Sequence, residues 1–234
     1  MEWSLSFEAS ACMTSQDKEP QLLIASAPLG DGWPEPMARF YQEQVPASLH
    51  PRLNAYRNWQ DRQRSIIGRL LLAKALQQYG FPDQAGEQIK IGPYGKPYAD
   101  FGFQFNIAHS ASRIVCVASR TVKVGVDIEQ IRTIDFSDFE SVMSPAQWQQ
   151  ILNSSDSLLA FWRFWTVKEA IAKADGRGLG LPLDTISVES SVAKLEQNRW
   201  YVTELHRWDG YCGYVAGSQL IRPDCIRFTD YQFG

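Results

Sequence analysis

The feature that most constrains the fold is an amphipathic stretch that ends in a cluster of glycines, residues 161–183. Its apolar residues recur at close to helical spacing, which predicts a helix with one buried face. Side-chain oxygens that can cap its first turn precede it, on Ser154, Ser155 and Asp156. Glycine adopts the left-handed conformation at a helix C-terminus and proline cannot continue a helix, so the end is predicted at Gly176, Gly178, Gly180 and Pro182.

One face of this predicted helix carries an aromatic ring, an acid and a base on successive turns, at Trp165, Glu169 and Lys173. Residues four apart lie on the same side of a helix, so the acid and the base are neighbours. They can form an exposed ion pair, which contributes only roughly a few tenths of a kcal/mol. Alternatively, they direct a carboxylate and an amine into a binding site. The spacing alone leaves both interpretations open.

A second informative stretch, residues 121–131, alternates apolar and polar side chains and therefore predicts a strand. Asp127 and Glu129 lie on one face of it, about 7 Å apart along the strand. Two carboxylates with little nearby to neutralise them suit a hard cation with oxygen ligands, above all Mg²⁺. The alternative is an exposed polar strand face. Gly125 argues against that alternative, because a glycine beside the pair leaves room for another group to approach.

Positive charge gathers in another predicted helix, residues 52–79, which has six basic residues and one acid between Arg52 and Lys74. This charge either covers a solvated helix face or forms a pocket for phosphates, with Arg57, Arg62, Arg64 and Arg69 as candidates. Lys96 lies in a Gly-Lys-Pro turn and His109 at the end of a predicted strand. Each is either an ordinary solvated or structural residue, or a further phosphate contact.

Composition excludes several classes of protein. An apolar fraction of 44% is ample for a packed core, and a net charge of −3 gives no reason to expect nucleic acid or an anionic membrane as a partner. No apolar run approaches the roughly 18 residues of a membrane span, and the first residues lack the pattern of a signal peptide. The cysteines form no CxxC pair, so a reduced, cytoplasmic setting is expected for Cys12, Cys116, Cys212 and Cys225.

Four motifs in a fixed order resemble the 4′-phosphopantetheinyl transferases of the monomeric Sfp type: GKPY at 95–98, FNIAHS at 105–110, VGVDIE at 124–129 and FWTVKEAIAKADGRGLGLPL at 164–183. The resemblance spans residues 56–188 and is specific as an ordered set. It implies an α+β fold of two similar halves related by a pseudo-twofold axis, with the active site between them. We expect residues 1–119 to form the first half and residues 120–234 the second, in a monomeric protein.

The resemblance also implies a reaction. Enzymes of this family move 4′-phosphopantetheine from coenzyme A to a serine hydroxyl of an apo acyl or peptidyl carrier protein, with Mg²⁺ as cofactor, and release adenosine 3′,5′-bisphosphate. Position by position, the motifs imply metal ligands at Asp127, Glu129 and Glu169. Glu169 is also expected to act as the base, directly or through an intervening water, and Lys173 to stabilise or protonate the departing phosphate. Together with the basic helix, the motifs predict coenzyme A contacts at Arg57, Arg64, Lys96, His109, Lys168 and Lys173.

One position departs from the family pattern, since Ala108 stands where the motif often has serine. We expect an altered affinity for coenzyme A from this loss of a hydroxyl, not a loss of activity. Two other functions use the same residues: a magnesium-dependent hydrolase of the pyrophosphate of coenzyme A, and a non-catalytic module that binds coenzyme A or a carrier protein. The joint presence of Asp127, Glu129, Glu169 and Lys173 argues against the module.

Overall fold

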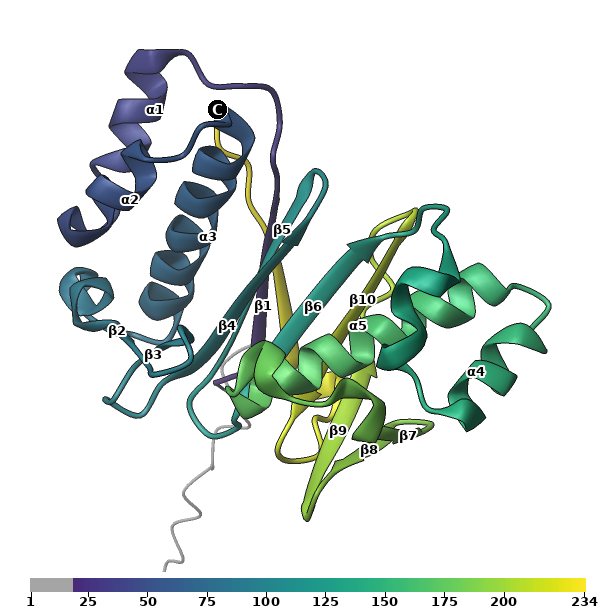
Figure 1. Cartoon of the computed structure of the whole chain (residues 1–234). Helices are drawn as coiled ribbons and strands as arrows, with labels where there is room; N and C mark the ends of the chain where they lie inside the picture. Colours follow the sequence, from purple (N-terminus) through teal and green to yellow (C-terminus); the bar gives the residue numbers. More distant parts are fainter. Residues whose placement is uncertain (1–18) are drawn as a thin grey trace, which may run out of the picture.

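A computed structural model describes residues 19–234, which form two main β-sheets with a long helix on the outer side of each (Figure 1). Residues 1–18, which include Cys12 and the stretch examined for a signal peptide, lie outside the described residues. Within the described part, no helix has the length and apolar character that crossing a bilayer requires. The mixed α+β class predicted from the sequence is confirmed.

The first sheet has the strand order β11-β1-β5-β4. Helix α3 (Trp59–Gln78) covers its outer face and buries Ile67, Leu71 and Leu76 against it. The two strands of the β4–β5 hairpin are joined by a tight turn in which Ala111 has a φ of 46°. The bounds of the four strands are β1 (Leu22–Pro28), β4 (Gln104–Ser110), β5 (Arg113–Ser119) and β11 (Ile226–Asp230).

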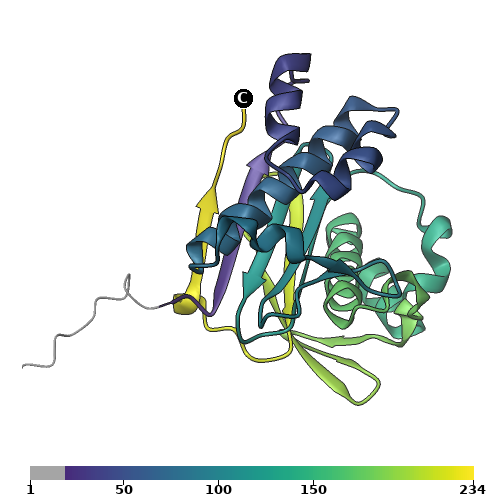
Figure 2. The same cartoon turned by 90° about the vertical axis from the view of Figure 1, so that its left-hand side faces the viewer.

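Two short helices cover the far side of α3, as Figure 2 shows. They are α1 (Glu35–Gln42) and α2 (His50–Asn54). The single helix expected over residues 52–79 is therefore wrong at its start: the chain turns after Asn54, and Leu53 of α2 packs back on Ile66 and Leu70 of α3. A small hairpin of β2 (Lys90–Ile91) and β3 (Pro97–Tyr98) follows α3 and η2 (Asp83–Gln88).

The second sheet has the order β6-β10-β9-β8-β7 and carries α5 (Ser157–Asp175) on its outer face. The predicted helix caps are confirmed: Asp156 accepts a hydrogen bond from the N–H of Leu159 at 2.9 Å, and Gly176 ends the helix with a φ of 99°. Helix α4 (Pro145–Leu152) begins with a capping box, in which the Ser144 side chain accepts a hydrogen bond from the N–H of Gln147. The strands are β6 (Val124–Gln130), β7 (Ser187–Glu189), β8 (Val192–Leu195), β9 (Asn198–Glu204) and β10 (Tyr211–Gly217).

The two halves repeat one topology. In each half, a first strand is followed by the long helix and then by a hairpin, and the last strand of the hairpin pairs with the first strand. β1, β5 and β4 therefore correspond to β6, β10 and β9. The chain passes from one sheet to the other between β5 and β6, near the predicted break at residues 119–122. β11 comes from the predicted second half but pairs with β1, so the division at residue 119 stays a proposal.

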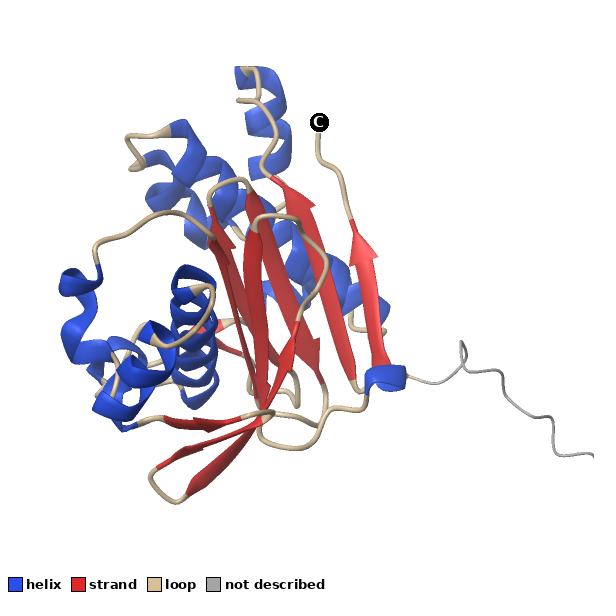
Figure 3. Ribbon diagram, turned by 90° about the vertical axis from the view of Figure 1, so that its right-hand side faces the viewer, coloured by secondary structure: helices blue, strands red, loops and turns tan. Residues whose placement is uncertain are grey.

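The inner faces of the two sheets pack on each other, and Figure 3 shows their long strands between the two groups of helices. Val115 and Val117 of the first sheet meet Val124, Val126 and Ile128 of the second. The edge strands β4 and β6 lie next to each other, with α3 on one side and α5 on the other (Figure 1). Any site that uses residues of both halves therefore lies along this pair of edges.

Candidate functional site

The acidic residues predicted to act together are brought together by β6 and α5. Asp127 is only 3% exposed, and its Oδ1 accepts a hydrogen bond from the Lys173 ammonium at 2.5 Å. Its Oδ2 is buried and, within residues 19–234, has no hydrogen-bond partner. The same holds for Oε1 of Glu169, one helical turn before Lys173. The interpretation of Glu169 and Lys173 as an exposed surface pair is thus wrong, and so is an exposed polar face at Asp127.

Gly125 explains why these side chains meet. A Cβ atom at this position would lie 2.2 Å from the carbonyl oxygen of Ala170 and 2.3 Å from the backbone nitrogen of Ala174. The backbones of β6 and α5 therefore touch, and this contact sets Asp127 beside the face of α5 that carries Glu169. The space predicted next to Gly125 exists, but the helix itself fills it, so the space does not admit a ligand.

Glu129 links the acidic residues to the first half of the molecule. Its Oε2 accepts a hydrogen bond from the Ser110 hydroxyl of β4 at 2.7 Å, and Trp165 Nε1 lies 3.4 Å from Oε1. A second contact joins the same two strands, because Asn106 Oδ1 accepts a hydrogen bond from the N–H of Val126 at 2.9 Å. Ser110 and Asn106 both belong to the FNIAHS motif, but the sequence assigned them no role, since their partners lie on another strand.

The electrostatics of these residues follow from their burial. Burial raises the pKa of Asp127, although the neighbouring ammonium of Lys173 opposes this. Burial also raises the pKa of Glu169, with Lys173 opposing and Glu129 adding to the effect. Burial works against the charge of Lys173, yet the carboxylates of Asp127, Glu169 and Glu129 raise its pKa above the ordinary value. The cluster therefore has more carboxylate oxygens than positive groups to satisfy them.

A hard cation suits this arrangement. Buried polar atoms are normally satisfied, so two unpartnered carboxylate oxygens on facing elements mark a place where a positive group is missing. Carboxylate oxygens are the ligands that Mg²⁺ prefers. Among residues 19–234, however, no three acidic, histidine or cysteine side chains already meet in metal-binding geometry. The ligand set of Asp127, Glu129 and Glu169 therefore stays a prediction that the donor chemistry fits.

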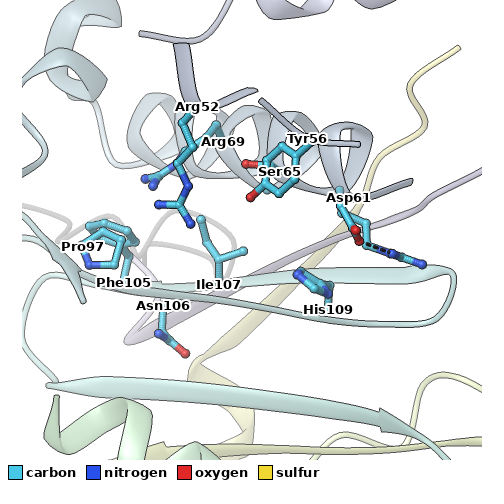
Figure 4. A pocket seen from close by; sticks show the side chains of 12 residues that line it. Arg52, Tyr56, Asp61, Ser65, Arg69, Pro97, Phe105, Asn106, Ile107 and His109 are labelled. Atoms are coloured by element: carbon cyan, nitrogen blue, oxygen red, sulfur yellow. Dashed lines mark hydrogen bonds and ion pairs between the residues drawn. The ribbon is translucent and has the colours of Figure 1, made fainter. Parts of the chain in front are cut away.

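A basic cavity of about 390 Å³ lies between α3 and β4 (Figure 4). Of the predicted phosphate contacts, Arg64, Arg69 and His109 line it. The sequence prediction missed most of its wall, because the residues that face the cavity depend on the rotation of α3 and on the turn before it. The close-up shows Arg52 and Arg69 together at one end of the cavity, and the lining also includes Tyr56 and Ser65.

Arg64 and His109 lie beside the β4–β5 turn, and Figure 4 shows His109 away from the pair of arginines. Arg64 donates from Nε and Nη2 to the carbonyl oxygen of Ala111, at 3.0 and 2.8 Å, and from Nη1 to Asp61 at 2.9 Å. Desolvation by the surrounding protein and the positive charges of Arg64 and Lys173 lower the pKa of His109. The imidazole is therefore neutral near pH 7 and can still donate one N–H. The cavity adjoins the acidic cluster, because Asn106 of its wall accepts a hydrogen bond from the N–H of Val126, the chain neighbour of Asp127.

Three of the sequence candidates do not reach this cavity. Arg57 is exposed in the turn between α2 and α3 and is not among the lining residues. Arg62 points the other way, where its Nη2 donates to Gln42 at 2.8 Å and its Nη1 lies 3.6 Å from Glu35. Ala108 lies in β4, only 4% exposed, within the core between the sheets. The predicted effect of its missing hydroxyl remains untested.

Two predicted lysine contacts are occupied elsewhere. Lys168 is fully buried, and its ammonium donates to the carbonyl oxygens of Val142 at 2.9 Å and Leu183 at 2.8 Å. This structure offers no support for the predicted contact from Lys168 to coenzyme A, because the buried ammonium joins two loops. Lys96 also binds backbone carbonyls, at the end of α5.

Comparisons with known proteins agree with this geometry. A profile described as the 4′-phosphopantetheinyl transferase superfamily matches residues 123–216. The 4′-phosphopantetheinyl transferase gsp of Aneurinibacillus migulanus is 33% identical over 138 residues, which are 58% of this chain and 58% of that protein. The 4′-phosphopantetheinyl transferase Sfp of Bacillus subtilis is 29% identical over 133 residues, 55% of this chain and 59% of its own length.

The chain thus matches less than two thirds of the length of these two relatives. A longer match exists to the 4′-phosphopantetheinyl transferase HetI of Nostoc sp., with 30% identity over 180 residues, 70% of this chain and 75% of that protein. The chain therefore belongs to the 4′-phosphopantetheinyl transferase superfamily, as a member of the Sfp type.

Proposed function

We propose that this protein transfers the 4′-phosphopantetheine group of coenzyme A to a serine hydroxyl of an apo acyl or peptidyl carrier protein, with Mg²⁺ as cofactor. One observation carries the proposal: a basic cavity and a cluster of buried, incompletely partnered carboxylates adjoin each other along the β4 and β6 edges. A substrate with several phosphates and a bound cation uses both kinds of site at once.

The cavity supplies the phosphate contacts. Arg64 and His109 donate to phosphate oxygens beside the β4–β5 turn, and the arginine pair adds positive charge. Arg69 and Arg52 suit this role, because guanidinium groups bind phosphate oxygens in a bidentate manner. Within residues 19–234 neither has a hydrogen bond or an ion pair to a carboxylate. Positioning of this kind supplies much of the catalysis in phosphoryl transfer.

Mg²⁺ would be held by Asp127, Glu129 and Glu169, and when bound it neutralises charge on the pyrophosphate. The serine oxygen of the carrier attacks the phosphorus that bears pantetheine, the bond from that phosphorus to the bridging oxygen breaks, and adenosine 3′,5′-bisphosphate leaves. Glu169 accepts the serine proton, since burial raises its pKa toward the range useful for a base. The Lys173 ammonium stabilises the released phosphate oxygen.

The decisive experiment is intact-mass spectrometry of a purified apo carrier protein incubated with this protein, coenzyme A and Mg²⁺. The expected result is a gain of one phosphopantetheine, absent when EDTA is added and absent when the carrier serine is replaced by alanine. Consumption of coenzyme A without a mass gain on several carrier types would instead show hydrolysis. Binding of coenzyme A without consumption or mass gain would show a binding module, and either outcome would overturn the proposal.

The net charge and the free thiols support a proposal for the partners and the cellular location of the protein. A net charge of −3 provides no general attraction to nucleic acid or to an anionic membrane, so we propose neither as a partner. Among the described residues, Cys116 and Cys212 are buried free thiols and Cys225 is a half-buried one. These thiols support a reducing, cytoplasmic setting. We propose a monomer, because the cavity and the acidic cluster both come from one chain.

The position of Lys168 gives a testable prediction. Replacing Lys168 by alanine leaves two buried carbonyl oxygens without their donor, at a cost of about 1–3 kcal/mol each. We expect the Tm to fall by roughly 5–10 °C. The Kd for coenzyme A, measured by calorimetry, should not change. The exposed Lys74 of α3, replaced by alanine, serves as the control and should change neither quantity. A large increase in Kd for Lys168→Ala with an unchanged Tm would restore the sequence-based role.

A further inference from the structure

Lys96 crosses from the first half of the molecule to the end of the helix that carries Glu169. It lies in the turn between β2 and β3, where Gly95 has a φ of 78° and Pro97 begins the return strand. Its Nζ donates to the carbonyl oxygen of Lys173 at 2.5 Å and to that of Ala174 at 3.1 Å. The hairpin of the first half therefore contacts the last turn of α5 directly.

The last turn of a helix needs such a partner. The final carbonyl groups of an α-helix have no N–H of their own helix to bind, and the negative end of the helix dipole lies there. In α5 the N–H of Gly176 satisfies only Ala172, at 3.0 Å. Lys96 supplies the donors for the next two carbonyls. It thus acts as a C-terminal cap that is provided by a distant segment of the chain.

The packing around Lys96 favours this contact over one with a ligand. A Cβ atom at Gly176 would lie 3.4 Å from Cδ of Lys96, so the lysine stem already lies against the helix end. Burial lowers the pKa of Lys96 to about 8, with a smaller effect of Lys123 in the same direction. Among the ion pairs of residues 19–234, none joins Lys96 to a carboxylate. The helix carbonyls are therefore the main compensation for its partly buried charge.

We propose that Lys96 is a positioning residue, which holds the last turn of α5 in place for catalysis and does not bind a phosphate of coenzyme A. The carbonyl oxygen of Lys173 accepts a hydrogen bond from Lys96, and the side chain of Lys173 donates one to Asp127. Glu169 lies one helical turn earlier. Lys96 thus binds the end of the helix that carries Glu169 and Lys173. Ser110 binds the strand β6, by donating a hydrogen bond to Glu129. This role rests on the proposed transfer activity.

The test compares Lys96→Met with the wild-type protein. The methionine side chain keeps the length of the stem but cannot donate hydrogen bonds. We expect kcat at saturating coenzyme A to fall at least tenfold, and the Kd for coenzyme A to change less than threefold by calorimetry. Hydrogen exchange at the amides of residues 173–176 should become faster by a similar factor. Lys96→Arg, which can donate to both carbonyls, should recover much of the kcat and of the protection from exchange.

A matched control is Lys90→Met, which removes an exposed lysine of the same hairpin that forms an ion pair with Asp100. It should leave kcat, Kd and exchange unchanged. A Kd for coenzyme A that rises tenfold in Lys96→Met, with normal kcat and normal exchange, would show a phosphate contact and overturn the proposal. An unchanged kcat together with unchanged exchange would also overturn it. A wild-type protein that modifies no carrier would refute the transfer activity, whereas the exchange measurement would still test the cap.

Discussion

Replacing Glu169 by glutamine should reduce kcat for phosphopantetheine transfer by about a hundredfold or more, the scale of loss expected when a general base is removed. Glutamine has nearly the same shape but cannot accept the serine proton, and it removes one negative charge from the proposed cation ligands. The stability of the folded protein should not decrease. Burial raises the pKa of Glu169, and its Oε1 has no partner within the described residues, so its charge opposes folding.

The measurement is single-turnover transfer to a carrier protein, followed by intact mass, with the Tm recorded on the same samples. We expect an unchanged or higher Tm in Glu169→Gln. Glu189 at the exposed end of β7 provides the control, since Glu189→Gln removes the same charge at a distance from the cluster. Near-normal turnover in Glu169→Gln would exclude Glu169 as the base. A large fall in Tm would show that the carboxylate supports the fold instead.

The largest effect on stability is expected for Gly125→Ala. The added methyl group would lie 2.2 Å from Ala170 O and 2.3 Å from Ala174 N, and both atoms belong to the backbone, so a change of side-chain rotamer cannot relieve the contact. Overpacking usually costs about 1–3 kcal/mol, and a clash with rigid backbone belongs at or above the upper end of that range. We expect the free energy of unfolding to fall by about 3 kcal/mol or more, and the Tm by roughly 10 °C.

Urea unfolding and calorimetry measure this effect. The control is Gly86→Ala, because a Cβ atom at Gly86 meets only Pro46, at 4.0 Å. That variant should keep the wild-type Tm. If Gly125→Ala were as stable as Gly86→Ala, the close approach of β6 and α5 could not be what sets Asp127 beside Glu169. Activity measured at low temperature, where the variant is still folded, should also be reduced, because a shifted helix moves Glu169.

Local patterns predicted the elements that carry the acidic residues. The alternation along residues 121–131 identified β6 and the shared face of Asp127 and Glu129, and the capping residues identified both ends of α5. Spacing along a strand or helix determines these features, because residues on one face follow directly from the period. The motifs then supplied the family, which composition alone did not.

Contacts between segments that lie far apart in the sequence could not be predicted from local patterns. Gly125 was understood as room for a ligand because the sequence does not reveal that α5 packs there. Lys168 and Lys96 were assigned to coenzyme A, whereas both bind backbone carbonyls that only the folded chain brings near. Arg52 was missed because its side chain reaches the cavity from the separate short helix α2. β8 and β11 were also missed, the latter because its partner β1 is far away in the sequence.

That pairing of β11 with β1 has a consequence for biosynthesis. β1 leaves the ribosome long before the strand that covers its free edge, in which Ile226 lies opposite Leu22. Until then the nascent first sheet exposes the backbone groups of β1 on that edge, and an uncovered edge readily pairs with other chains. Translation through residue 230 therefore ends an aggregation-prone interval, and slow codons or stalling between β1 and β11 would prolong the dependence of the nascent chain on chaperones.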